Sequence, residues 1–234
     1  MRKILLMALL ATTAHLMAKE TTVTTADELK SAISNANAGD IIWVAAGTYA
    51  FTTVPGIAIS RSGTSTNPIT LKAIEGARPV IDFSGQARNN SSAQGMKLTA
   101  SYWYIKGLDI YKAGDNGLQI AGGHYNTIEF CNFYECNDSG LQIDNGATNN
   151  LILNCDYYFN ADATKENADG FACKLSVGNN NKFKGCRSWR NLDDGWDGYL
   201  RNTDNITTYY EDCWTFQNGY DKDGVAGSGD GNGF

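Results

Sequence analysis

The stretch from Asn167 to Asp197 holds two short runs, Asn167-Ala168-Asp169-Gly170-Phe171 and Asp193-Asp194-Gly195-Trp196-Asp197, and each contains an Asp-Gly-aromatic core. The pattern of a polar residue, a glycine and an apolar residue recurs along the chain at Gly117, Gly140, Gly170, Gly195 and Gly233. Repetition at intervals of 23 to 38 residues, with one short apolar strand in each unit, is typical of a solenoid. We therefore predict an all-β fold, a right-handed parallel β-helix with roughly three strands in each coil.

Stacking of the coils brings the acidic residues of these runs together. Equivalent positions in neighbouring coils lie about 4.8 Å apart, so we expect Asp169 and Asp194 to be neighbours in one column. Asp193 and Asp197 lie close by on the second coil. Carboxylates that close repel each other unless a cation lies between them. Four around one point predict a Ca²⁺ site, and the alternative is that Asp simply favours the turns between coils.

The composition of the chain is that of one secreted β-rich domain. The 234 residues include 25 glycines, 3 prolines and 11% aromatic residues, which suits many turns and is too apolar for disorder. Residues 1–18 resemble a secretory signal, because Arg2 and Lys3 precede an apolar run that is too short to span a bilayer. We expect residues 19–234 to form one extracellular or periplasmic domain, monomeric and without membrane association after signal removal. A net charge of −6 argues against a nucleic-acid partner.

All six cysteines lie after residue 130. An even number of cysteines in a secreted chain is compatible with disulfides. However, Cys131, Cys155, Cys186 and Cys213 have contexts that suggest the same position in successive coils. We therefore predict a mostly unpaired ladder of buried cysteines that act as small apolar residues. Their spacing does not resemble a zinc site.

The ends of the chain differ in character. The pattern of residues 25–37 predicts an amphipathic helix that caps the solenoid, with Thr25 and Glu28 as a capping box. We expect residues 19–25 to form a polar leader. At the other end, residues 227–233 are rich in glycine and Phe234 stops within a predicted strand. Since a solenoid needs a terminal cap for solubility, we expect this β-helix domain to be incomplete at its C-terminus and part of a longer protein.

Between these ends, short apolar runs predict the strands. They lie at 41–44, 57–59, 69–73, 79–82 and, as a pair around one glycine, 103–110. A second theme is an asparagine followed by an alternating strand, and it begins at Asn126, Asn150, Asn181 and Asn205. Asparagine tolerates the left-handed turn conformation, so we expect these amides to stack between coils.

Four stretches together resemble family 9 of the polysaccharide lyases: Asn167–Leu175, Asp193–Asp197, Gly114–Leu118 and Gly231–Phe234. The likeness runs from about Ala26 to the end of the chain. The resemblance implies a secreted parallel β-helix that cleaves pectate (polygalacturonate) by β-elimination with Ca²⁺ as cofactor. It also implies that the calcium ligands are Asp169, Asp193, Asp194 and Asp197.

The catalytic base is not identified by this resemblance. The family's base is a lysine that follows a Gly-Asn-Gly-Phe run, and here that run is Gly231–Phe234, after which the chain ends. We therefore expect the metal site without the family's base, and little or no activity from the chain alone. Lys174 is a weak candidate for a substitute base.

Lys174, Arg190 and Arg201 are candidates for binding the uronate carboxylates of pectin, and the alternative for each is a solvated surface cation. Trp196 is expected in the core rather than on a sugar-binding face, and we assign His124 no role.

Two rival functions stay open at this point. One is a metal-independent polygalacturonate hydrolase on a β-helix, which four crowded carboxylates disfavour. The other is a non-catalytic carbohydrate-binding β-helix.

Overall fold

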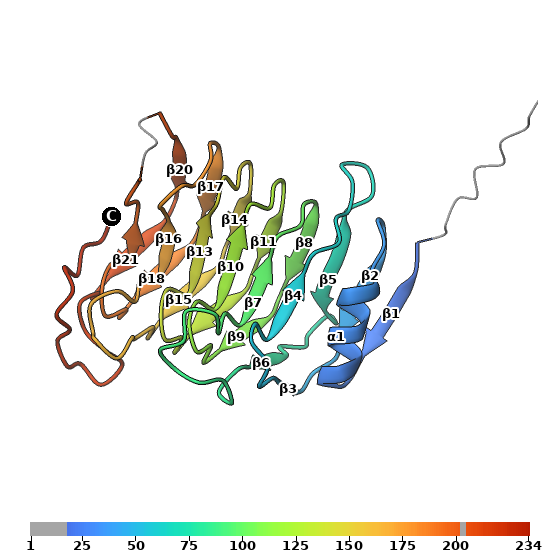
Figure 1. Ribbon diagram of the computed structural model, residues 1–234, viewed down its shortest axis with the longest axis horizontal. Helices are drawn as coiled ribbons and strands as arrows, with labels where there is room; N and C mark the ends of the chain where they lie inside the picture. The colour runs from blue at the N-terminus through green and yellow to red at the C-terminus, as the bar shows by residue number, and fades with distance from the viewer. Residues whose placement is uncertain (1–17, 202–204) are drawn as a thin grey trace, which may run out of the picture.

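The computed structural model describes residues 18–201 and 205–234, and these residues form a parallel β-helix whose coils stack along the long axis of the molecule (Figure 1). The predicted signal peptide lies outside the described residues except for Ala18. From β2 onward, strands that follow one another in sequence lie in different sheets, and strands one coil apart pair in parallel within three sheets. The predicted fold class is therefore confirmed.

The three sheets run the length of the solenoid, and each is built from strands that lie one coil apart. In spatial order, the eight-stranded sheet consists of β1 (Glu20–Val23), β2 (Ile41–Val44), β5 (Ile69–Ala73), β8 (Trp103–Lys106), β11 (Thr127–Glu129), β14 (Leu151–Leu153), β17 (Asn181–Lys184) and β20 (Thr208–Glu211). The seven-stranded sheet consists of β3 (Thr48–Ala50), β6 (Val80–Asp82), β9 (Asp109–Tyr111), β12 (Asn132–Tyr134), β15 (Asp156–Tyr158), β18 (Arg187–Trp189) and β21 (Trp214–Phe216). The six-stranded sheet consists of β4 (Ile57–Ile59), β7 (Met96–Leu98), β10 (Leu118–Ala121), β13 (Leu141–Asp144), β16 (Phe171–Cys173) and β19 (Trp196–Asp197).

Apolar side chains fill the space between the sheets, and the strand register stacks them in columns. One column in the eight-stranded sheet runs through Ile42, Leu71, Ile105, Ile128, Ile152 and Phe183, and each of these is at most 2% exposed. Fully burying one such side chain contributes roughly 1.5–3 kcal/mol. The repeated apolar position therefore makes each coil a stabilising platform for the next.

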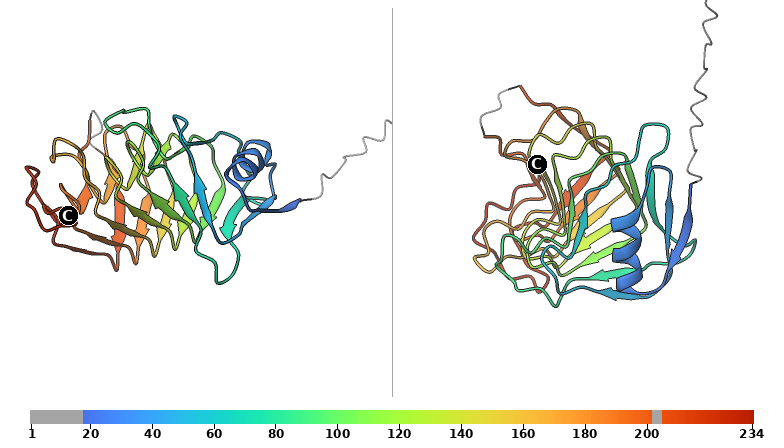
Figure 2. Two further views of the ribbon diagram at one scale, coloured as in Figure 1. Left: turned by 90° about the horizontal axis from the view of Figure 1, so that it is seen from below. Right: turned by 45° about the vertical axis from the view of Figure 1, so that its right-hand side comes forward.

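The only helix among the described residues, α1 (Ala26–Asn35), closes the N-terminal end of the solenoid (Figure 2). Thr25 is its N-cap and forms the predicted capping box with Glu28. Leu29 and Ile33 are buried against the first coil, which confirms the cap. The prediction of a polar leader at residues 19–25 was wrong, because residues 20–23 form β1, which pairs in parallel with β2 and buries Val23.

Buried asparagines form a ladder at one turn between sheets. The backbone N–H and the side-chain amide of Asn126 both donate to Asn150 Oδ1 at 3.0 Å. Asn150 donates to Asn181 Oδ1 in the same way, at 3.1 and 3.0 Å. The predicted stacking is confirmed for these three. It fails for Asn205, because the register pairs Asn181 with Thr208 and leaves Asn205 exposed.

A second asparagine ladder lies at another turn and was not predicted. Asn160 Nδ2 donates to Asn191 Oδ1 at 2.9 Å, and Asn191 Nδ2 donates to Asn218 Oδ1 at 3.1 Å. The cysteines behave as predicted, since all six are free and all except the half-buried Cys213 are buried. In the ladder, the backbone N–H of Cys131 donates to Cys155 Sγ at 3.5 Å.

Candidate metal centre and groove

The outer face of the six-stranded sheet carries polar side chains along a groove. Leu118 and Ile120 of β10 are buried in the core, so Gln119 between them points outward, because successive residues of a strand face opposite sides. Gln142 of β13, Ala172 of β16 and Asp197 of β19 occupy the same column as Gln119. The sheet thus places one outward position per coil along the groove.

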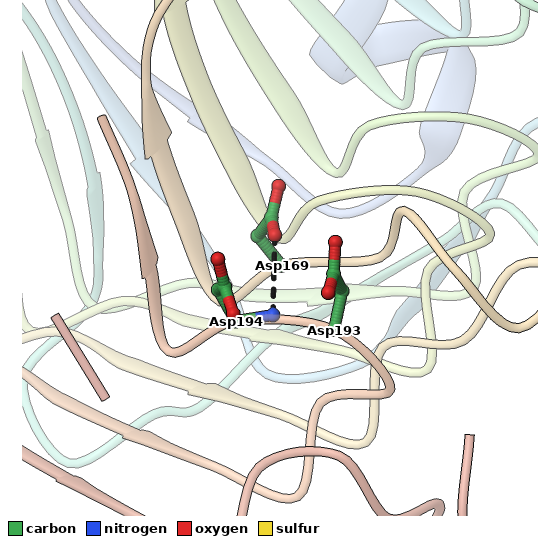
Figure 3. Close-up of side chains that lie close together, drawn as sticks. All are labelled: Asp169, Asp193 and Asp194. Carbon is green, nitrogen blue, oxygen red and sulfur yellow. Dashed lines mark hydrogen bonds between the residues drawn. The ribbon is translucent and has the colours of Figure 1, made fainter. Parts of the chain in front are cut away.

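Asp169 and Asp194 are neighbours in one column, as the coil repeat predicts. Gly140 N–H donates to Asp169 O at 3.0 Å and Gly170 N–H donates to Asp194 O at 2.9 Å, which sets the two aspartates one above the other. Asp169, Asp193 and Asp194 each offer a carboxylate oxygen, and these oxygens all lie within 4.8 Å of one another. Figure 3 shows the three carboxylates pointing to the same side, with the Asp194 N–H bonded to Asp169.

Asp197 lies outside this group of three and joins it through Lys174. The Lys174 ammonium contacts Asp169 Oδ2 at 2.9 Å and Asp197 Oδ2 at 2.8 Å. The side chain of Asp169 is fully buried, and those of Lys174 and Asp197 are 15% and 20% exposed. Ser139 Oγ donates to Asp169 Oδ2 at 2.9 Å. An ammonium group therefore compensates the buried carboxylate in this arrangement.

Burial and mutual repulsion change the acidity of the cluster. Burial raises the pKa of Asp169 to about 6, against the opposing effect of Lys174. Burial also raises the pKa of Asp193 to about 6, and Asp194 adds to this increase. Burial also raises the pKa of Asp194. The pKa of Lys174 is raised, because Asp169 and Asp197 outweigh the lowering effect of its burial.

The glycine-rich end of the chain packs onto the cluster. The backbone N–H of Asp230 donates to Asp193 Oδ1 at 2.8 Å, and that of Asn232 donates to Asp194 Oδ1 at 2.7 Å. A Cβ atom at Gly229 would lie 2.3 Å from Asp193 Oδ1, so the backbone approaches this closely only without a side chain. These contacts, like that of Ser139, were not predicted. The alternation of glycine with polar residues from Gly227 to Gly233 is the signal that points to the contacts of the chain end.

Lys174 also lines a groove of about 590 Å³ that crosses several coils. The residues that line it are polar or charged except for Leu175, and they include Asp115, Asn116, Gln119, Asn137, Asp138, Gln142, Asp144 and Asp162. A larger hollow of about 900 Å³ lies beside α1 and β2 and shares none of these residues. We assign function to the groove, because it adjoins the clustered carboxylates through Lys174.

The other predicted residues lie apart from the cluster or in the core. Arg190 follows β18 of the seven-stranded sheet, and its Nε donates to Gln217 Oε1 at 3.1 Å. Arg201 follows Leu200, which forms an isolated β-bridge with Leu175. The Arg201 guanidinium faces the Tyr199 ring. Trp196 is 3% exposed, stacks on Phe234 and packs against Phe171 with its ring tilted, which confirms its core position. His124 Nδ1 accepts from Thr148 N–H at 3.2 Å.

The carboxylate geometry fits a calcium ion. Ca²⁺ takes oxygen ligands at 2.3–2.6 Å, so two ligands on opposite sides of the ion lie about 5 Å apart. The three oxygens within 4.8 Å satisfy this limit, and the buried Asp169 already requires a positive partner. Fold and site together define a parallel β-helix protein with a cluster of carboxylates beside an outer groove.

Comparison with known proteins gives the family. Residues 8–234 match the family model described as "Pel9A-like, right handed beta helix region". The chain is 39% identical over 220 residues to pectate lyase L of Thermoclostridium stercorarium, covering 88% of this chain and 17% of that protein. It is 36% identical over 211 residues to pectate lyase L of Dickeya chrysanthemi, covering 86% of this chain and 49% of that protein. The crystal structure of pectate lyase Pel9A superposes with a TM-score of 0.80 at 30% identity, covering 92% of this chain and 59% of that one.

The chain belongs to the Pel9A-like right-handed β-helix family. This confirms the resemblance to polysaccharide lyase family 9 and the predicted handedness. The chain spans less than half the length of the two curated relatives above. Within residues 18–201 and 205–234, no helix has the length and apolar character needed to cross a membrane.

Proposed function

We propose that the protein is a calcium-dependent pectate lyase, which cleaves α-1,4-galacturonan by β-elimination. The observation that carries this proposal is the set of three carboxylates within 4.8 Å, in a chain whose family relatives are named pectate lyases. Asp169, Asp193 and Asp194 would hold the ion, and Asp197 would complete the set. We also propose that the protein is secreted, since its polymeric substrate lies outside the cell.

The reaction removes the proton at C5 of a uronate and expels the sugar attached through the 4-oxygen. When bound, a calcium ion stabilises the negative charge that develops on the adjacent carboxylate and holds the substrate in place. The chain's own contribution is a rigid set of ligands. Ser139 Oγ and the backbone N–H groups of Asp230 and Asn232 fix the carboxylates of Asp169, Asp193 and Asp194.

Lys174 is proposed to bind a uronate carboxylate rather than to abstract the proton. A base must be neutral to accept a proton, whereas Asp169 and Asp197 raise the pKa of Lys174 in spite of its burial. Its place in the groove lining puts a positive charge where an anionic chain would lie. We propose the same role, binding of a uronate carboxylate, for Arg190 and Arg201. We assign the catalytic base to none of the described residues.

The test is an absorbance assay of the whole protein on polygalacturonate. We expect unsaturated uronate to accumulate with Ca²⁺ and to stop accumulating when a chelator is added. Activity that survives chelation would remove calcium from the mechanism. Saturated products would support a hydrolase, and calcium-dependent binding of oligogalacturonate without turnover would support a non-catalytic β-helix.

A further inference from the structure

A second groove, of about 540 Å³, lies where the eight-stranded sheet turns into the seven-stranded sheet. One wall is formed by the first residues of β12, β15, β18 and β21, which the register stacks as Asn132, Asp156, Arg187 and Trp214. The middle residues of β12, β15 and β18 are buried, so this column points outward, because successive residues of a strand face opposite sides. The second groove shares no residue with the groove beside the aspartate cluster.

The other wall is the turn that precedes each of these strands. Four residues with positive φ occupy it in successive coils, namely Phe130, Asn154, Gly185 and Asp212. A Cβ atom at Gly185 would lie 2.3 Å from Asn154 Oδ1, so the Asn154 side chain uses space that only glycine leaves free. The second groove crosses four coils, which at about 4.8 Å per step gives a length of about 14 Å. This length suits a short oligomer.

Two guanidinium groups line the second groove, and a carboxylate fixes each of them. Arg187 Nε and Nη2 donate to the two oxygens of Asp156 at 2.7 and 2.5 Å. Arg78 Nε donates to Asp109 Oδ1 at 2.7 Å, and its Nη1 donates to Phe130 O at 2.5 Å. The two arginine side chains are 59% and 40% exposed, whereas those of their carboxylate partners are 16% and 15% exposed. An approaching ligand therefore meets the cations before the carboxylates.

Both guanidinium groups keep donors for a ligand. Among the described residues, Arg187 Nη1 and Arg78 Nη2 make no hydrogen bond. A guanidinium carries five N–H donors in a planar fork that matches the geometry of a carboxylate. Because the aspartates already hold both forks in place, binding of an anion immobilises little further side-chain freedom. The second groove is thus prepared for a ligand with carboxylate groups.

Exposed aromatic rings lie at both ends of the second groove. Trp214 is 69% exposed and Phe130 is 45% exposed. Trp214 contacts no other ring among the described residues, whereas the neighbouring outward column is stacked ring on ring through Tyr111, Tyr134, Tyr158, Trp189 and Phe216. Stacked rings offer a ligand mainly their edges. The Trp214 indole instead offers an open apolar face, on which the C–H face of a sugar ring can pack.

We propose that the second groove is a metal-independent binding site for an acidic oligosaccharide, in which Arg78 and Arg187 bind uronate carboxylates and Trp214 carries a sugar ring. The choice of a uronate as the source of the carboxylates rests on the proposed function. Such a site keeps the protein attached to its polymer when the metal centre is empty. Asp212 is the exposed carboxylate of the lining, and its charge opposes the binding of an anion.

The test is a calorimetric titration of the full chain with trigalacturonate in chelator, which keeps the metal centre empty. We expect binding, and an affinity at least roughly tenfold lower for the uncharged galactose trimer of the same linkage. Arg187→Gln and Trp214→Ala should each weaken trigalacturonate binding about threefold to tenfold, because they remove a charge-assisted contact and the packing surface. Asp212→Asn should strengthen it about twofold, because a repulsive charge is lost.

Two matched controls should bind like the unaltered protein. Lys30→Gln removes a positive charge from α1, and Tyr125→Ala removes a ring that is 52% exposed at the turn before β11. Circular dichroism establishes that each variant is folded.

Absence of binding in chelator would overturn the inference. Equal affinity for the uncharged trimer would also overturn it, as would an affinity that Arg187→Gln and Trp214→Ala both leave unchanged. Binding in chelator by a protein that shows no lyase activity in calcium would refute the proposed function and leave the second groove supported as an acidic-sugar site.

Discussion

Replacing Lys174 by methionine should destabilise the metal-free protein strongly and the calcium-bound protein little. Asp169 is fully buried, and its Oδ2 lies 2.9 Å from the Lys174 ammonium. Removing one partner of such a buried pair costs about 3–5 kcal/mol. For a domain of this size, 1 kcal/mol corresponds to about 2–4 °C, so the melting temperature in chelator should fall by about 6–20 °C. Calcium would supply the missing positive charge and reduce the difference.

The assay is thermal unfolding by circular dichroism, with and without Ca²⁺. Lys182→Met is the matched control, because Lys182 and its partner Glu211 are 40% and 41% exposed and such pairs contribute less than about 1 kcal/mol. Burial raises the folded-state pKa of Asp169 to about 6 against the lowering effect of Lys174, so without Lys174 this pKa rises further and the carboxyl group is neutral at pH 5. The effect of Lys174→Met should therefore shrink at pH 5. A variant that melts like the unaltered protein in chelator at pH 8 would refute this reasoning.

Three further outcomes are expected. Calcium affinity should fall by roughly 10–100-fold between pH 7 and pH 5. The pKa values of Asp169 and Asp193 are about 6, and carboxyl groups must lose their protons to bind the ion. Calcium titrations at both pH values check this, and a constant Kd would contradict it. Asn150→Ala should cost about 2–4 kcal/mol in denaturant unfolding, since it removes the side-chain oxygen that accepts two hydrogen bonds from the buried Asn126 and the amide that donates to Asn181, whereas Asn205→Ala should change little. A hydrogen bond with Cys186 is the main cause that lowers the pKa of Cys213 to about 7. Cys213 should therefore be alkylated at pH 7.5, while the buried Cys131 and Cys155 stay unmodified; mass spectrometry of the alkylated protein checks this.

Regular patterns made the fold predictable from the sequence. The capping box at Thr25 and Glu28 and the apolar runs beginning at Ile41 and Ile69 are local signals, and each formed the expected element. Residues 20–23 were missed because they alternate polar and apolar weakly, and pairing with β2 supplies their order. The strand Met96–Leu98 was missed because polar loops surround it, and its register comes from β10 and β4.

The candidate site was predictable where it depends on the coil repeat. Asp169 and Asp194 share a column, and column membership follows from the spacing of their glycines. The place of Lys174 between Asp169 and Asp197 depends on side-chain direction and burial, which one sequence does not show. The approach of the chain end to Asp193 likewise depends on a long return of the backbone.

The most direct test of the central claim is a crystal structure of the chain grown with calcium. We predict one ion bonded at about 2.3–2.6 Å to Asp169, Asp193, Asp194 and Asp197, with the Lys174 ammonium moved away from Asp169. A structure at millimolar calcium that keeps Lys174 between Asp169 and Asp197, with no ion among the four carboxylates, would contradict it.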